Sequence, residues 1–242
     1  MRQIWGKSDT VLFIFAGAAA EFALNRAVDW LYFTGKLPAD PLGRLFSTVS
    51  YSKRILFARY GEALKIIDSI SSIHRNIERA RVQSIPAWAY RDVLFMLIHY
   101  SIASYETLER KLSEAEKEEV FDVFYRFGKR MHLEGLPDNY HKWLATRNED
   151  LQHDLVKSEY TTDLYKQYKK HLGSFRYRVL IEGQIIVVPE QVKQLLHFRK
   201  FSFLNLFLPF YKLSRTLRLD SLVKSLILPP GYKQEIKAMD IV

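Results

Sequence analysis

The sequence of 242 residues contains no cysteine. This absence excludes a disulfide scaffold, a thiolate nucleophile, zinc–thiolate sites and iron–sulfur clusters. Glycine and proline are sparse, at ten and eight residues. Long hydrophobic runs are also missing, because the longest uncharged stretches, residues 10–20 and 93–105, are shorter than the roughly 18–20 residues that span a bilayer. The N-terminus lacks the apolar core of a signal peptide. We therefore expect a cytoplasmic protein that is not integral to a membrane.

The composition is that of a globular protein, with 48% hydrophobic and 26% charged residues. A chain of this length can bury a sizeable core without disulfides or metal ions. Helical periodicity dominates, and no repeats or clear linkers interrupt it. We predict a single all-α domain of eight to ten helices.

The formal net charge of +9 is unevenly distributed. From residue 189 onward there are nine Lys or Arg residues against four Asp or Glu residues. This excess could face nucleic acid, an anionic membrane surface or only water. The stretch from Phe201 is both strongly apolar and basic, so it could lie in a membrane interface or close the core with its basic side in water. Peripheral contact with an anionic membrane is the partner that we expect, and no nucleic acid.

Several helix boundaries have recognisable signals. Asp40 is suited to cap a helix that begins at Pro41, and Ser113 with Glu116 forms a capping-box pattern. Gly17 lies in an alanine-rich segment, where it permits close contact with another helix. The predicted helices are residues 9–33, 41–59, 62–79, 87–111, 136–156 and 161–172, with others opening at 113 and 189.

Residues 176–188 are ambiguous. Their Ile-Ile-Val-Val run could form a strand. Helical patterns flank the run on both sides, however, and a lone strand has no partner. We therefore predict a helix there.

Three residues with cofactor chemistry fall within residues 40–78. Arg44 and Thr48 are four apart in D-P-L-G-R-L-F-S-T and share a helix face. His74, in S-I-H-R-N-I-E, shares the apolar stripe of the next predicted helix. The imidazole could ligate iron or another metal, Arg44 could hold a propionate or an oxyanion, and Thr48 could donate to bound oxygen. Spacing alone favours ordinary roles: a core histidine, a surface ion pair, and a threonine bonded to its own backbone.

Other polar residues lie in apolar segments. Asp29 and Glu21 could each act as a base near a cofactor, or form a salt bridge with Arg26 or Arg44, because an unpaired buried carboxylate is costly. His99, in F-M-L-I-H-Y-S-I, could bind the same metal as His74 from the opposite side or be a core histidine. The sequence lacks a phosphate-binding glycine loop, G-x-S-x-G, H-E-x-x-H and the paired E-x-x-H of di-iron bundles.

The patterns D-P-x-x-R-L-x-x-T and I-x-x-I-H resemble the rubber oxygenase catalytic-domain family. This family includes latex clearing proteins and the endoplasmic-reticulum-bound mpaB-type oxygenases. The resemblance covers about residues 12–196 and includes W-A-Y-R-D-V-L-F-M-L-I-H, L-S-E-A-E-K and R-Y-R-V-L-I. Its most specific part is the order and separation of Arg44, Thr48 and His74.

The resemblance implies an all-α fold with globin-like haem housing and a b-type haem. It implies that His74 is the proximal iron ligand, that Arg44 and Thr48 are polar residues of the haem pocket, and that Asp29 is the catalytic base. The family chemistry is oxidative cleavage of an isoprenoid carbon–carbon double bond by dioxygen. Residues 1–200 would then form the oxygenase-like helical domain, and residues 201–242 a basic amphipathic extension packed on it.

Two features depart from the rubber-cleaving members. Those members carry a lysine directly before the threonine, where this chain has Ser47, and they are exported. We therefore expect a haem-dependent oxidoreductase that acts on a smaller apolar unsaturated substrate, such as a prenyl lipid drawn from a membrane. The alternatives are a non-catalytic protein that holds a lipid or prenyl chain, and a peripheral membrane protein whose purpose is its basic C-terminal segment.

Overall fold

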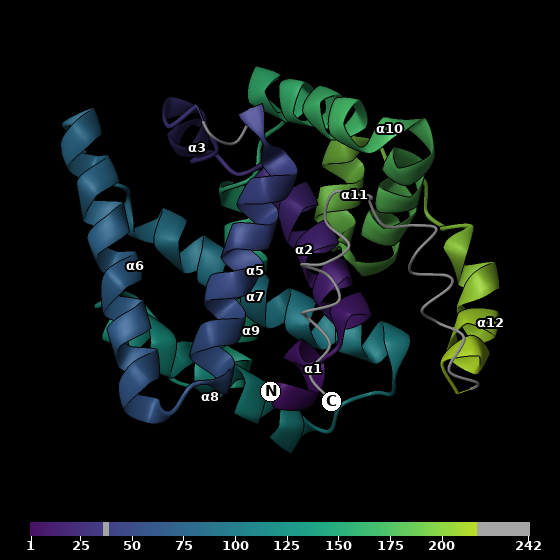
Figure 1. Cartoon of the computed structure of the whole chain (residues 1–242), viewed down its shortest axis with the longest axis horizontal. Coiled ribbons are helices and arrows are strands. Elements are labelled where there is room, and N and C mark those ends of the chain that lie inside the picture. Colours follow the sequence, from purple (N-terminus) through teal and green to yellow (C-terminus); the bar gives the residue numbers. More distant parts are fainter. Residues whose placement is uncertain (36–38, 217–242) are drawn as a thin grey trace.

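The computed structural model describes residues 1–35 and 39–216, which form eleven helices (Figure 1). No strand or sheet occurs in this part of the chain, so the predicted all-α class is confirmed. The count exceeds the expected eight to ten because two helices are only four and five residues long. The helices are α1 (Arg2–Trp5), α2 (Ser8–Phe22), α3 (Asp29–Phe33), α5 (Pro41–Phe57), α6 (Tyr60–Arg81), α7 (Ala87–Leu108), α8 (Glu114–Arg130), α9 (Tyr140–His153), α10 (Glu159–Val187), α11 (Glu190–Leu196) and α12 (Leu204–Thr216).

The centre of the fold is the crossing of α2 and α7, around which the other helices are arranged (Figure 1). Gly17 of α2 lies so close to α7 that a Cβ atom there would come within 2.2 Å of the Tyr100 ring. Trp5 is fully buried beside them and donates from Nε1 to Ser101 Oγ at 3.0 Å. The close helix contact predicted at Gly17 is therefore confirmed.

A buried ion pair ties α9 to this centre. The guanidinium of Arg147 donates to both carboxylate oxygens of Glu21, which also accepts a hydrogen bond of 2.8 Å from the Tyr100 hydroxyl. All three side chains are buried. Glu21 is therefore paired, which is one of the two predicted alternatives. Its partner is Arg147 of α9 and not Arg26 or Arg44.

The prediction of one long helix over residues 9–33 is wrong for residues 23–28. The chain leaves the helix after Phe22 and resumes it at Asp29. Asn25 causes the break, because its side chain accepts from the backbone N–H of Ala27 at 2.9 Å and its backbone pairs with Leu155. Turn residues within an apolar segment can thus interrupt a helical pattern.

Residues 159–187 form α10, so the helix predicted over 176–188 is confirmed. Ser158 caps the helix through a hydrogen bond with the backbone N–H of Thr161. Gly173 has φ 71° and ψ 168°, which marks a kink where two helical segments meet. The helix that was predicted to end at Gly173 instead bends there and continues.

Two other predicted boundaries can be compared with the structure. The capping box of Ser113 and Glu116 is present at the start of α8. The helix expected from residue 136 begins instead at Tyr140, because the side chain of Asn139 accepts from the backbone N–H of Lys142.

The C-terminal extension is described only in part. Its residues 204–216 form α12, which contacts α10, whereas residues 217–242 lie outside the described part of the chain. The domain division at residue 200 stays a prediction. Among the described helices, none combines the length and the apolar character needed to cross a membrane.

Candidate active site

The hairpin of α5 and α6 positions the three candidate residues. The Asp40 side chain caps α5 by accepting from the backbone N–H of Gly43 at 2.9 Å, and Pro41 occupies the first turn. Residues 58 and 59 connect α5 directly to α6, and the two helices pack against each other. This arrangement brings Arg44 and Thr48 of α5 to the same space as His74 of α6.

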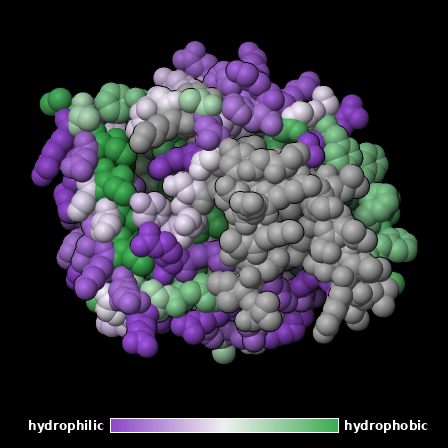
Figure 2. Space-filling model, in the orientation of Figure 1, coloured by the Kyte–Doolittle hydropathy of each residue, from purple (hydrophilic) through white to green (hydrophobic). Residues whose placement is uncertain are grey.

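That space is a mainly apolar cavity of about 2170 Å³. It is roughly twice the upper end of the 300–1,000 Å³ range of ordinary ligand pockets. Side chains from α2, α5, α6, α7, α8, α10 and α12 line it, and Arg44, Thr48 and His74 are among them. The α6 wall consists largely of the apolar stripe predicted for this helix, which we call the isoleucine stripe because it contains Ile67, Ile70, Ile73 and Ile77. Figure 2 shows strongly hydrophobic side chains along that side of the molecule.

The side chain of His74 lines this cavity. Its Nδ1 is buried and has no hydrogen-bond partner among the described residues, and its ring packs against that of Tyr90 with 5.1 Å between the centroids. Burial, and after it the positive charge of Arg44, lowers the pKa of His74, while Glu78 acts in the opposite direction. The imidazole is therefore held neutral, which is the form that ligates a metal.

The side chain of Thr48 forms a hydrogen bond with the backbone of Arg44. The Thr48 hydroxyl donates to the Arg44 carbonyl at 3.0 Å, which is the ordinary role that spacing favoured. Both residues nevertheless line the cavity, where Arg44 supplies a positive charge. Ser47, at the position of the family's lysine, does not line it.

Asp29 is placed differently from the other candidates. Its carboxylate accepts a hydrogen bond of 2.6 Å from Arg81 at the end of α6, and Arg81 in turn lies 4.1 Å above the Trp30 ring. Trp30 lines the cavity, but Asp29 does not. The structure thus supplies a salt bridge for Asp29, with a partner other than the expected Arg26 or Arg44.

His99 does not share the cavity with His74. It lies on α7 against Tyr100, and its side chain is absent from the cavity wall. Burial, followed by the charge of Arg147, lowers the pKa of His99 to about 4, so this histidine is also neutral. The arrangement gives no support to two histidines holding one metal from opposite sides.

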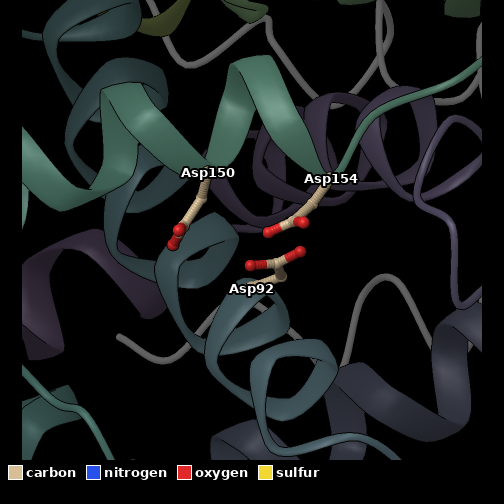
Figure 3. A group of neighbouring side chains, drawn as sticks. All are labelled: Asp92, Asp150 and Asp154. Carbon is tan, nitrogen blue, oxygen red and sulfur yellow. The ribbon is translucent and has the colours of Figure 1, made fainter.

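A second cluster of chemical interest lies away from the cavity. Asp92 of α7 and Asp150 and Asp154 at the end of α9 bring carboxylate oxygens within 4.8 Å of one another (Figure 3). Asn25 donates to Asp92 at 2.7 Å, and Arg91 donates to Asp150 at 3.2 Å. Burial raises the pKa of Asp92 to about 7. Such a cluster can share a proton or hold a hard cation.

Sequence reasoning missed several polar residues at the cavity. Tyr90 faces His74, and its hydroxyl is 3.4 Å from Glu78, which also accepts from the backbone N–H of Ile85 at 2.8 Å. Glu78 follows His74 by four residues, so its place on the same helix face could have been predicted. Asp9 and Glu119 also line the cavity, but no sequence pattern connects them to it.

Two residues of the cavity wall have the chemistry that a metal-containing cofactor requires. A neutral, buried imidazole nitrogen without a partner costs free energy unless something binds it. A positive charge on the same wall suits an anionic substituent. His74 and Arg44 are therefore the residues that could hold a metal-containing cofactor.

Comparison with known proteins gives one result. Residues 3–217 match the family described as ER-bound oxygenase mpaB/B'/rubber oxygenase, catalytic domain. No curated protein and no solved structure matches the chain. The match spans nearly the whole described fold, including both helices that carry Arg44, Thr48 and His74. The chain therefore belongs to this family and is an oxygenase catalytic domain.

Proposed function

We propose that the protein is a haem-dependent oxygenase that acts on an apolar unsaturated, isoprenoid-like molecule with dioxygen. Membership of the family supplies the oxygenase class. The proposal of haem and of an apolar substrate rests on one observation: His74, Arg44 and Thr48 line one large apolar cavity. Globin-like housing of the haem is part of this proposal.

His74 would hold the cofactor. Its unpartnered ring nitrogen and lowered pKa suit a ligand of the haem iron, and Arg44 would pair with a propionate. When bound, b-type haem supplies the activation of dioxygen. The volume of the cavity leaves room for an apolar substrate beside the cofactor.

The remaining wall would select the substrate and exclude water. Apolar side chains favour a hydrocarbon over a polar ligand, because transfer of apolar area from water contributes about 25 cal/mol per Å². Among His74, Arg44 and Thr48, only Thr48 carries a hydroxyl group, and its side chain lies on this wall. Its oxygen still has acceptor capacity while its proton is donated to Arg44.

Asp29, the candidate base, is held in a salt bridge. Its carboxylate is engaged by Arg81 and lies outside the cavity wall. Proton abstraction by Asp29 would require release of that salt bridge. Asp9, which does line the cavity, is engaged by Tyr211 and Arg215.

This arrangement favours one competing function. The described carboxylates that line the cavity, Asp9 and Glu119, are both in ion pairs, and such a cavity is also suited to a protein that only holds a lipid or prenyl chain. In that case the protein as purified would contain an apolar ligand and no iron.

Titration of the protein with haemin, followed by absorption spectroscopy, tests the proposal. We expect wild-type protein to give the spectrum of a histidine-ligated haem with one equivalent bound, and His74→Ala to lose that spectrum. His171→Ala is the matched control, because His171 is exposed on α10 and does not line the cavity. Identical spectra for wild type and His74→Ala would show that His74 is not the ligand.

Turnover tests the remaining assignment. With haem bound, Thr48→Val should lower oxygen consumption in the presence of an unsaturated prenyl lipid while leaving the haem spectrum intact. Ser50→Val, on the exposed side of α5, should leave both unchanged. Iron-free protein that retains lipid and consumes no oxygen would establish the binding function instead.

A further inference from the structure

Helix α12 is oriented with its apolar side chains toward solvent. Four large apolar residues of α12, together with Phe203 directly before it, recur at helical spacing, so they form one stripe. Each is more than half exposed, and Figure 2 shows hydrophobic side chains at the edge of the molecule where α12 lies. The stripe comprises Phe203 (63% exposed), Leu206 (69%), Phe207 (60%), Phe210 (70%) and Leu213 (58%).

Polar bonds fix the start of α12 against the body of the protein. The carboxylate of Glu182 on α10 accepts from Ser202 Oγ at 2.7 Å and from the backbone N–H of Phe203 at 2.8 Å. It also accepts from the guanidinium of Arg199. Ser202 is buried by these contacts. The first turn of α12 is therefore held in one orientation.

The other end of α12 is fixed in the same way. The Tyr211 hydroxyl donates to Asp9 at 2.9 Å, and Arg215 donates to Glu109 and lies 3.4 Å from Asp9. Asp9 is buried and belongs to α2. Because polar bonds hold both ends inward, the outward position of the apolar stripe is set by the fold and is not a loose attachment.

The charge of this segment identifies the surface that it fits. No Asp or Glu occurs between Glu190 and Asp220, whereas Arg199, Lys200, Lys212 and Arg215 all fall in the described part of that interval. Arg199 and Arg215 form ion pairs with Glu182, Asp9 and Glu109 of other segments, and Lys200 and Lys212 supply positive charge beside the stripe. A contiguous exposed apolar stripe with lysines beside it is typical of helices that lie in the interface of an anionic membrane.

The stripe is also continuous with the cavity. Leu204, Phe207, Leu208 and Tyr211 of α12 line it, and Phe207 belongs to both the stripe and the cavity wall. A lipid surface beneath α12 would therefore lie directly against one wall of the apolar cavity. A polar protein partner would gain nothing from that continuity.

We propose that α12 docks the protein on an anionic lipid surface by inserting the stripe into the boundary between headgroups and acyl chains. The surface also brings apolar molecules to the α12 wall of the cavity. The second statement rests on the proposed substrate class, whereas docking itself requires neither haem nor turnover. Failure of one can thus be separated from failure of the other.

Flotation of the haem-free, full-length protein with vesicles tests docking. We expect wild type to bind vesicles of phosphatidylcholine and phosphatidylserine, to bind phosphatidylcholine alone more weakly, and to bind less at raised salt. Leu206→Glu combined with Phe210→Glu should weaken binding at least about tenfold, because it places two charges in the inserted stripe. Neither residue lines the cavity, and both are exposed, so folding should be unaffected.

Val82→Glu is the matched control. Val82 is 92% exposed at the end of α6, on the opposite side of the molecule from α12 (Figure 1). It should bind vesicles like wild type. Absence of wild-type binding to either vesicle, or equal binding by the double variant, would overturn the proposal. A wild-type dimer in light scattering that the double variant converts to a monomer would assign the stripe to a second copy of the chain instead.

Discussion

Arg44 and His74 lie on the two helices of one hairpin and line the same cavity, and the charge of the arginine adds to burial in lowering the pKa of the imidazole. The cation that would pair with an anionic substituent therefore also keeps the candidate iron ligand neutral. The position of Arg44 near His74 therefore serves both requirements of the proposed cofactor.

Replacement of Arg44 should reverse part of this effect. In haem-free Arg44→Met, we expect the pKa of His74 to rise, because a nearby positive charge is removed. Titration of the His74 ring by NMR measures the change. Arg54→Met, on an exposed position of the same helix, should leave the His74 titration as in wild type, and an unchanged pKa in Arg44→Met would contradict the electrostatic coupling.

Asp92 should make stability depend on pH. Its pKa is raised from 3.8 to about 7, so the folded state favours the protonated form, and stability is lost as pH rises from about 4 to about 7. Asp92→Asn mimics the protonated form and should be more stable than wild type above pH 7, by on the order of 1–3 kcal/mol, with little difference near pH 4.

Urea unfolding at several pH values measures this difference. Asp122→Asn, at an exposed position of α8, is the control and should change stability by less than about 0.5 kcal/mol throughout. A wild-type protein that is stabilised by Ca²⁺, with the effect absent in Asp92→Asn, would show that the three aspartates hold a cation and do not share a proton.

Gly17→Ala should destabilise the α2–α7 crossing. The added Cβ would approach two ring carbons of Tyr100 at 2.2 and 2.3 Å, so the helices or the ring must shift. We expect a loss of about 1–3 kcal/mol, measured as a lower urea midpoint. Gly61→Ala meets nothing within 4 Å in the first turn of α6 and should be neutral or slightly stabilising.

Arg147→Met should be among the most damaging single substitutions. It leaves the buried Glu21 carboxylate with the Tyr100 hydroxyl as its remaining described partner, and breaking such a pair costs about 3–5 kcal/mol. Arg110→Met breaks an exposed pair with Glu116 and should cost at most about 1 kcal/mol. Thermal or urea unfolding distinguishes the two, and equal losses would mean that the buried pair is not special.

The sequence was sufficient for those parts of the fold that local rules control. The Asp40 cap, the Ser113 capping box and the isoleucine stripe of α6 follow from neighbouring residues, and all were predicted. Arg44, Thr48 and His74 could be brought together because a two-residue link joins their helices. Their presence in one cavity could be expected from the resemblance to the family.

Relationships between distant residues were not predictable from one sequence. Arg81 became the partner of Asp29, and Arg147 that of Glu21, because tertiary packing brings them together across long stretches of chain. The break at Asn25 depends likewise on a backbone contact with Leu155. In α12 the helical period was visible, but which face turns outward is decided by Glu182 and Asp9 on other helices.

The hydrogen bonds that hold α12 bear on the domain boundary predicted at residue 200. Three carboxylates, on Asp9, Glu109 and Glu182, accept hydrogen bonds from residues 199–215. A protein truncated after residue 200 would keep these acids and lose most of their donors, including the cation of Arg215. These contacts make α12 part of the domain surface, so a protein that lacks it should show lower expression and solubility.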